Sequence, residues 1–421
     1  MISKIIGTTF SRSLIAVFGL LILILNTRYL GAEKLGQLAI YIIIISAIVQ
    51  VSEFVGGPSL VFLQTKYSIR HLLIASYGWS ILVSLVSCVF LYLTAGFNNS
   101  QSWIISAIIF LQSLNHVHLH LLVGKEHIKG YNLSSLMLSL VIVCGIAYSY
   151  ISLEKADVID YLKIYFFALS LSLIISSWFV LRIPSSITTT YSLKLMLKEI
   201  LNYGAIIQIT NLLQFGVYRL NYLILEGFTS TANLGIYSVG NQLSEKALVP
   251  GNAISLVQYS SIANTPDKNK SIPLTFKMII LSGGITLFTI LLLLVTPSQW
   301  FSFILGTEFK PISGLFMYLA PGVFALSISV IYSHYFAGLG LYRNNLISSG
   351  LGLILTIVLS YLLIPKHGMK GAALASSFVF IGQTIIQIYF FKNETKLSWR
   401  GILKGHKNAI SYYFTKLFRR K

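Results

Sequence analysis

The stretch Met278–Thr296, MIILSGGITLFTILLLLVT, contains no charged side chain and is long enough to cross a lipid bilayer as one helix. Similar apolar runs of about 20 residues recur along the chain, as the roughly 30 Å of hydrocarbon in a membrane demands of a helix. The alternating pattern of barrel strands is absent from the sequence. We expect about twelve spans, near residues 5–27, 36–54, 71–95, 102–123, 132–152, 159–181, 200–224, 233–257, 275–296, 311–337, 345–364 and 371–391.

The overall composition leads to the same conclusion. Of the 421 residues, 55% are hydrophobic and only 10% are charged, and the mean hydropathy is +0.77. A soluble globular chain carries roughly 25% charged residues. Because water alone cannot solvate a surface this apolar, lipid must form part of the solvent. We therefore predict an all-α integral membrane protein.

The distribution of basic residues predicts the orientation. The formal net charge is +19. Lys and Arg concentrate in every second connection and in the tail 392–421, which is the pattern of cytoplasmic segments, so we expect both termini in the cytoplasm. Since the basic residues flank spans and do not form a soluble module, we expect no nucleic-acid partner. The tail is expected to lie against anionic lipid headgroups, which makes membrane lipids partners of the chain.

The chain divides evenly about its longest inner connection. We expect an N-terminal lobe at 1–182, a cytoplasmic linker at 183–199, a C-terminal lobe at 200–391 and a basic tail at 392–421. The halves echo each other weakly, because Leu35-Gly36 and Leu234-Gly235 open the second and eighth spans. An internal duplication of this kind is typical of secondary transporters. It predicts two pseudo-symmetric lobes of about six helices each around a central cavity.

Three stretches in a fixed order carry a family resemblance. The first is RYLGAEKLG at 28–36. The second is RLNYLIL at 219–225, which continues to LGIYS at 234–238. The third comprises LGTEF at 305–309, AGLG at 337–340, LIPKHG at 363–368 and GAA at 371–373. Together they cover nearly the whole chain.

In these stretches the sequence resembles the multidrug/oligosaccharidyl-lipid/polysaccharide exporter superfamily, in particular its O-antigen and polysaccharide flippases. The family often has an acidic residue where this chain has Tyr218. The resemblance implies translocation of an undecaprenyl-diphosphate-linked oligosaccharide from the cytoplasmic to the periplasmic leaflet. It also implies a bacterial inner membrane, and a glycan polymerase or other assembly proteins as further partners.

Two neighbouring spans carry wide polar stripes. At 100° per residue, one arc of the seventh span contains Gln208, Asn211, Gln214, Tyr218, Arg219, Asn221 and Tyr222. The eighth span repeats the pattern with Ser238, Asn241, Gln242, Glu245 and Lys246. Such a stripe either faces water or forms hydrogen bonds with a neighbouring helix. Because both stripes include cations, we favour a water-filled lumen.

The cations define a predicted substrate site. A cavity lined by Arg12, Arg28, Arg219 and Lys246 would attract anions, and guanidinium groups match phosphate geometry. For Arg12 the other interpretation is that the first span begins after it. The candidates for contact with sugars, which need hydrogen bonds and flat aromatic faces, are Asn211, Gln214, Tyr218, Tyr222 and Asn241.

Other ionisable residues suggest coupling to an ion gradient. The candidates are Glu53, Glu245 and His334. Glu245 could instead form a structural ion pair with Lys246, and a buried neutral state is the more common situation for a histidine such as His334. We predict no metal site, because His116, His118 and His120 have no carboxylate beside them within their own span.

The alternatives to a flippase are a multidrug exporter of the same fold and a membrane glycan polymerase or glycosyltransferase. Cationic drugs favour an acidic or aromatic cavity, whereas the predicted one is cationic. The aspartates Asp157, Asp160 and Asp267 lie in or at the edge of predicted loops and form no Asp-x-Asp pair. No phosphate-binding Gly-x-x-x-x-Gly-Lys motif occurs. We therefore expect neither an enzyme nor a cofactor.

Overall fold

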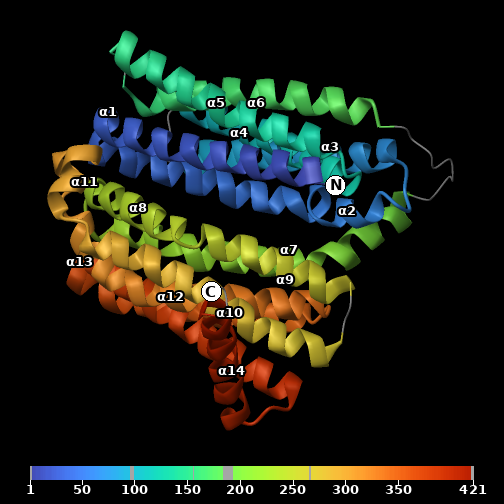
Figure 1. The fold of residues 1–421 in the computed structure, drawn as a ribbon. Helices are drawn as coiled ribbons and strands as arrows, with labels where there is room; N and C mark the ends of the chain where they lie inside the picture. Colours follow the sequence, from blue (N-terminus) through green and yellow to red (C-terminus); the bar gives the residue numbers. More distant parts are fainter. Residues whose placement is uncertain (1, 95–98, 155, 184–192, 265–266, 419–421) are drawn as a thin grey trace. The chain divides into compact units, whose positions relative to one another are not determined.

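The computed structural model describes residues 2–94, 99–154, 156–183, 193–264 and 267–418, and each regular element in these ranges is helical (Figure 1). Contacts group the chain into two compact units, Met1–Leu212 and Leu213–Lys421. The boundary falls inside α7 (Leu193–Phe228), further along the chain than the predicted linker at 183–199. Residues 184–192 of that linker lie outside the described ranges, and residues 193–199 form the first turns of α7.

Unit 1 is built around α4, which packs against α1, α2, α3, α5 and α6. Its elements before α7 are α1 (Ile2–Gly56), α2 (Ser59–Leu63), α3 (Ile69–Thr94), α4 (Asn99–Gly124), α5 (Ile128–Ala147), the π-helical turn η1 (Tyr148–Ser152) and α6 (Val158–Leu181). Ile105, Ile108 and Ile109 of α4 are fully buried between Ile45 of α1 and Leu162 of α6. The i, i+3 and i+4 spacing of the three isoleucines places them on one face of α4, which is the face buried in this cluster.

Unit 2 is built around α12, which packs against α8, α9, α10, α11 and α13. After α7 its elements are α8 (Thr231–Lys246), α9 (Val249–Asn264), α10 (Lys268–Val295), α11 (Ser298–Leu305), the 3-10 turn η2 (Thr307–Phe309), α12 (Ile312–Gly338), α13 (Tyr342–Thr395) and α14 (Trp399–Phe418). Its core contains the aromatic side chains Tyr332, Tyr335, Phe336 and Phe391. Since α4 and α12 contain the fourth predicted span of each half, the packing of the units supports the predicted duplication.

The membrane-spanning helices agree with the prediction. Eight helical stretches of the described residues are long and apolar enough to cross a bilayer. Two of them, in α1 and α13, are long enough for two spans each. α7 and the pair α8 and α9 contribute the remaining spans, although polar side chains make α7 and α8 less apolar than the rest. The prediction of an all-α integral membrane protein with about twelve spans is therefore confirmed.

Two of the motif glycines separate the paired spans. Within α1 the backbone at Gly31 has φ +72° and ψ 178°, and within α13 the backbone at Gly368 has φ +54° and ψ −129°. L-residues with side chains rarely adopt such angles, so glycine is required at both breaks. A Cβ atom on Gly371 would lie 2.2 Å from the carbonyl oxygen of Leu363, so the two arms of α13 meet closely after the break.

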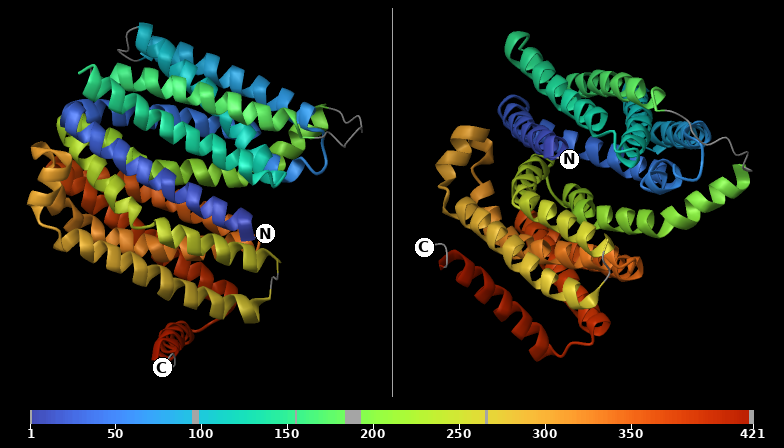
Figure 2. Two further views of the ribbon diagram at one scale, coloured as in Figure 1. Left: turned by 45° about the horizontal axis from the view of Figure 1, so that its top comes forward. Right: turned by 45° about the vertical axis from the view of Figure 1, so that its right-hand side comes forward.

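The C-terminal residues are helical. Residues 392–395 of the predicted tail complete α13, and α14 follows as a separate helix that packs against α10 (Figure 2). Gly405 lies against the ring of Phe276 on α10, where a Cβ atom would approach to 2.3 Å. The Tyr413 hydroxyl donates a hydrogen bond of 3.3 Å to the backbone carbonyl of Lys277. The tail is therefore a docked helix and not an extended segment.

We expect Gly368→Ala to lower the free energy of unfolding by about 1–3 kcal/mol, because alanine would be strained at this positive φ. The matched control is Gly284→Ala on α10. Both glycines have room for a methyl group, since the nearest atom to a Cβ on Gly368 is 3.7 Å away and nothing lies within 4 Å at Gly284. Thermal unfolding of the detergent-purified protein measures both variants. Equal midpoints for the two variants would show that the break at Gly368 does not depend on its backbone angles.

Candidate functional sites in the two units

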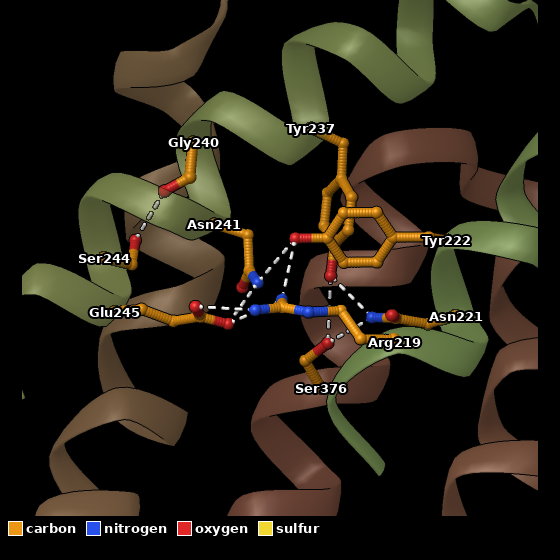
Figure 3. Close-up of polar contacts among 9 residues, drawn as sticks. All are labelled: Arg219, Asn221, Tyr222, Tyr237, Gly240, Asn241, Ser244, Glu245 and Ser376. Atoms are coloured by element: carbon orange, nitrogen blue, oxygen red, sulfur yellow. Dashed lines mark hydrogen bonds and ion pairs between the residues drawn. The ribbon is translucent and has the colours of Figure 1, made fainter. Parts of the chain in front are cut away.

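The guanidinium of Arg219 on α7 is paired with the carboxylate of Glu245 on α8. Its two terminal nitrogens donate hydrogen bonds of 2.8 and 3.0 Å to the two carboxylate oxygens (Figure 3). This parallel arrangement is the strongest form of a carboxylate–guanidinium contact. About a quarter of the Arg219 side chain is exposed (26%), so the pair lies at the edge of the packed interior. Glu245 therefore pairs with Arg219 and not with Lys246, which faces outward at the end of α8.

Two predicted sugar-contact residues belong to the same network. Arg219 donates a second hydrogen bond of 3.1 Å to the Tyr222 hydroxyl. The Asn241 amide donates to that hydroxyl and to Glu245, at 2.9 Å in each case (Figure 3). Tyr222 and Asn241 are almost fully buried. In this conformation they therefore hold the ion pair in place and do not line an open surface.

A second set of bonds ties α7 and α8 to α13. The Asn221 amide donates to the Tyr237 hydroxyl at 2.6 Å and to the Ser376 hydroxyl at 2.7 Å. Tyr237 and Ser376 are themselves 3.0 Å apart (Figure 3). Because each of these groups is buried, the bonds compensate the cost of removing them from water. The sequence predicts that Asn221 lies on the polar stripe of the seventh span, but it does not identify Tyr237 and Ser376 as the partners of this side chain.

The other polar residues of α7 face different neighbours. Gln214 accepts hydrogen bonds from Ser349 at 2.9 Å and from Gln383 at 3.1 Å, both on α13. The ring of Tyr218 meets that of Phe380 edge-on, with 5.8 Å between centroids. Asn211 lies in the part of α7 that belongs to unit 1. Much of the stripe of α7 thus forms hydrogen bonds between helices, which is the interpretation the sequence analysis had left second.

The remaining predicted cations are exposed. Arg12 and Arg28 are exposed on α1, the latter near the break at Gly31, and Lys246 is exposed as the last residue of α8. Arg12 and Arg28 belong to unit 1, whereas Arg219 and Lys246 belong to unit 2. The charge of Arg219 is compensated by the Glu245 carboxylate of the neighbouring helix α8.

Glu53 on α1 is joined by two histidines of α4. The Nδ1 of His116 donates to a Glu53 carboxylate oxygen at 2.6 Å, and the Nε2 of His120 lies 4.0 Å from the same oxygen. His118 faces the other side of α4, where it bonds to Tyr77 and to Ser176. The sequence analysis missed this cluster because the carboxylate comes from another span. The one-turn spacing of His116 and His120 was the available signal.

His334, the last coupling candidate, bonds within its own helix. Its Nδ1 donates to the Val330 carbonyl of α12 at 2.8 Å, and its ring lies edge-on to Tyr259 of α9. No group of three His, Cys, Asp or Glu side chains in the described ranges is arranged to hold a metal ion. The three coupling candidates therefore lie apart, Glu53 with two histidines in unit 1, Glu245 with Arg219 in unit 2, and His334 within α12.

We expect Glu245→Gln and Arg219→Gln each to lower the free energy of unfolding by about 1.5–3 kcal/mol, because each leaves one charge without its partner. The double variant should recover part of that loss, so the two changes should not be additive. Urea or thermal unfolding of all four proteins completes the cycle. Strictly additive effects would show that the bonds between these two side chains contribute no stability.

The comparisons with known proteins identify the fold. The sequence matches no protein-family model and no curated protein. A multidrug resistance MATE family transporter of the MOP superfamily, in its inward-facing conformation, superposes with a TM-score of 0.72 at 13% identity, over 95% of this chain and 96% of that one. The lipid II flippase MurJ gives a TM-score of 0.71 at 16% identity, over 100% of this chain and 93% of MurJ.

A third similar structure is a MOP superfamily transporter from Pyrococcus furiosus, described as having a binding pocket of reversed polarity that suggests a different function. It gives a TM-score of 0.66 at 13% identity, over 93% of this chain and 94% of that one. These similarities extend over nearly the full length of each protein. The chain is therefore a multi-pass membrane protein with the fold of the MOP superfamily transporters.

Proposed function

We propose that this protein is a flippase that moves an undecaprenyl-diphosphate-linked oligosaccharide, such as an O-antigen repeat unit, from the cytoplasmic to the periplasmic leaflet. The observation that carries the proposal is the balance of charge at membrane depth. Glu53 and Glu245 are each bonded to a basic side chain, whereas Arg12 and Lys246 are exposed. Charged groups in membrane spans usually face a substrate or ion pathway.

The negative charge of the proposed substrate suits spans in which cations are exposed and the carboxylates are already bonded. A diphosphate carries negative charge that must be compensated when it leaves water, and Arg and Lys are the side chains that bind it most strongly. A cationic drug would need an uncommitted carboxylate. In the described spans Glu53 and Glu245 are already engaged by His116 and Arg219.

The similar structures support transport by this fold, and they include both substrate classes. The MATE transporter is described as a multidrug resistance protein and MurJ as a lipid II flippase. The Pyrococcus furiosus protein adds that a change of pocket polarity in this fold suggests a change of function. Export of cationic drugs is therefore the second candidate, and the charge of the transport pathway distinguishes it from the first.

The proposed mechanism is alternating access, in which the two units expose the substrate site first to one side and then to the other. The diphosphate and sugars cross through the protein, while the polyprenyl tail remains in the lipid. The chain itself performs no chemical conversion, and an ion gradient or the membrane potential supplies the energy. We place the protein in a bacterial inner membrane with both termini in the cytoplasm, where a glycan polymerase or other assembly proteins would use its product.

In proteoliposomes, we expect the wild-type protein to move an undecaprenyl-diphosphate oligosaccharide between leaflets. Lys246→Gln and Arg12→Gln should each slow the movement by about 10-fold or more, because a hydrogen bond to a charged group contributes about 1.5–3 kcal/mol. Lys310→Gln is the matched control, since Lys310 is also exposed but lies beside η2 at the end of α11.

The same vesicles distinguish the second candidate. Movement of the lipid-linked glycan with no movement of a cationic dye supports the flippase. Transport of the dye with no movement of any lipid-linked glycan would replace the flippase by a drug exporter.

The lipid partner that we propose for the C-terminus follows from the three faces of α14. One face, with Ile402 and Ala409, is buried in the core cluster that also contains Phe276 of α10. The adjoining face exposes the large apolar side chains Trp399, Leu403 and Ile410.

The basic side chains Arg400, Lys404 and Lys407 are exposed beside the apolar face, at the spacing of one helical stripe. A docked helix with an apolar face next to a basic one suits the boundary between acyl chains and anionic headgroups.

Replacing Arg400, Lys404 and Lys407 together with Gln should reduce the anionic phospholipid that remains bound after purification, since each basic residue near such a surface contributes about 1 kcal/mol. Mass spectrometry of the bound lipid measures the change. The control replaces Lys310, Lys366 and Lys370, which are equally exposed and lie in predicted periplasmic connections. If both triple variants retain the same anionic lipid as the wild type, α14 does not bind the headgroups.

A further inference from the structure

The contacts of Glu245 in unit 2 have the geometry of an occupied anion-binding site. The two terminal nitrogens of Arg219 donate to its carboxylate, at 2.8 Å to one oxygen and at 3.0 Å to the other. The Asn241 amide donates a third hydrogen bond, of 2.9 Å, to the first of these oxygens. Three donors from α7 and α8 therefore converge on one anion, and that anion is a side chain of the protein itself (Figure 3).

The donors are also held by a contact that does not involve the carboxylate. The Tyr222 hydroxyl accepts hydrogen bonds from Arg219 at 3.1 Å and from Asn241 at 2.9 Å. The ring of Tyr222 is buried and lies edge-on to the ring of Tyr237, with 5.2 Å between centroids. Because this buried hydroxyl fixes both donors, they remain aimed at the same place when the carboxylate leaves. Donors arranged in advance in this way lower the cost of binding an anion.

The ion pair lies where a ligand can reach it. The Arg219 and Glu245 side chains are 26% and 31% exposed, whereas Tyr222 and Asn241 are almost fully buried. The fixed part of the site is therefore the buried part, and the carboxylate lies at its exposed edge. Opening a fully buried ion pair would leave two charges without solvent, but a partly exposed carboxylate can be hydrated when it is released.

The group that can replace Glu245 must resemble a carboxylate and carry at least as much charge. A guanidinium binds carboxylate and phosphate in the same bidentate manner, through two parallel hydrogen bonds. A diphosphate offers several acceptor oxygens and more than one negative charge, so it competes for the same donors. A neutral alcohol offers no charge and cannot compensate Arg219.

We propose that Glu245 is an internal competitor for the diphosphate of the substrate. It occupies the donors of Arg219 and Asn241 when no substrate is bound, and the incoming diphosphate displaces it. This inference rests on the proposed function, because it names the residues at which that substrate is recognised. Glu245 thereby determines specificity, since a ligand must carry enough negative charge to replace a bonded carboxylate.

The same exchange run backwards assists release. When the diphosphate leaves, Glu245 returns to the guanidinium, so Arg219 is never left in the membrane without an anion. Removing the carboxylate should therefore have two opposite effects. The substrate should bind more tightly, because nothing competes with it, and it should leave more slowly, because nothing replaces it.

The first test measures binding and does not depend on transport. Isothermal titration calorimetry of the detergent-purified protein uses farnesyl diphosphate as the probe and farnesol as its neutral counterpart. Glu245→Gln should bind farnesyl diphosphate about 10-fold more tightly than the wild type, because glutamine keeps the shape of the side chain but not its charge. Farnesol should bind both proteins equally.

The matched control for this gain is Glu226→Gln. Glu226 is exposed near the end of α7 in the same unit, so its replacement removes the same charge. The affinity for farnesyl diphosphate should then stay at the wild-type value. If Glu245→Gln fails to fold, Glu245→Asp replaces it, because a shorter carboxylate pairs less well with Arg219 and should give a smaller gain in the same direction.

The dependence on Arg219 excludes a general effect of charge. Arg219→Gln should bind farnesyl diphosphate at least 10-fold more weakly than the wild type. Adding Glu245→Gln to this variant should restore little of the loss, because the gain requires the guanidinium that the carboxylate had occupied.

The second test measures movement of the lipid-linked glycan in proteoliposomes at several substrate concentrations. Glu245→Gln should lower both the half-saturating concentration and the maximal rate. A carboxylate that only supports packing would change the amount of folded protein and would not lower the half-saturating concentration. Glu226→Gln should match the wild type in both quantities.

The outcomes separate the two proposals. If the wild type moves no lipid-linked glycan but Glu245→Gln gains affinity for farnesyl diphosphate through Arg219, the internal competitor stands and the flippase does not. If the glycan moves and Glu245→Gln binds farnesyl diphosphate no more tightly than the wild type, the flippase stands and the competitor is overturned. An equal gain in Glu226→Gln would also overturn it.

Discussion

The cost of placing polar and charged groups at membrane depth is the constraint on which this structure depends. Lipid offers no hydrogen bonds, so each such group must find a partner in the protein or face water. In unit 2 the partners of Arg219 and Asn221 come from α8 and α13, and in unit 1 those of Glu53 come from α4 and α7. The polar residues that make α7 less apolar than its neighbours are also the ones that connect it to them.

The positions of the spans could be predicted because a single physical rule determines them. The length of an apolar helix must match the thickness of the bilayer, and this pattern is local in the sequence. The breaks at Gly31 and Gly368 are local as well, and both glycines fall in the motifs that carried the family resemblance. Their backbone angles explain in physical terms why glycine stands at these two positions.

The partners of the polar residues could not be predicted, because they depend on which helices meet. Glu245 adjoins Lys246 in the sequence, yet successive residues of a helix point in different directions, and its partner is Arg219 of α7. His116 and His120 had no carboxylate within their own span, but the fold supplies Glu53 from α1. Sequence periodicity identifies the face on which a residue lies and not the helix that the face meets. Arg219, which the sequence predicts as a phosphate ligand, pairs with Glu245 in this structure and donates a hydrogen bond to Tyr222.

The proposed flippase requires a transport pathway that presents positive charge to its substrate. The most direct measurement is the affinity of the protein in lipid nanodiscs for undecaprenyl diphosphate, compared with neutral undecaprenol and with a cationic drug of similar size, at low and high salt. We expect the diphosphate to bind most tightly, and we expect salt to weaken its binding while leaving the binding of undecaprenol unchanged. Equal affinity for the diphosphate and undecaprenol, or a preference for the cation, would contradict this expectation.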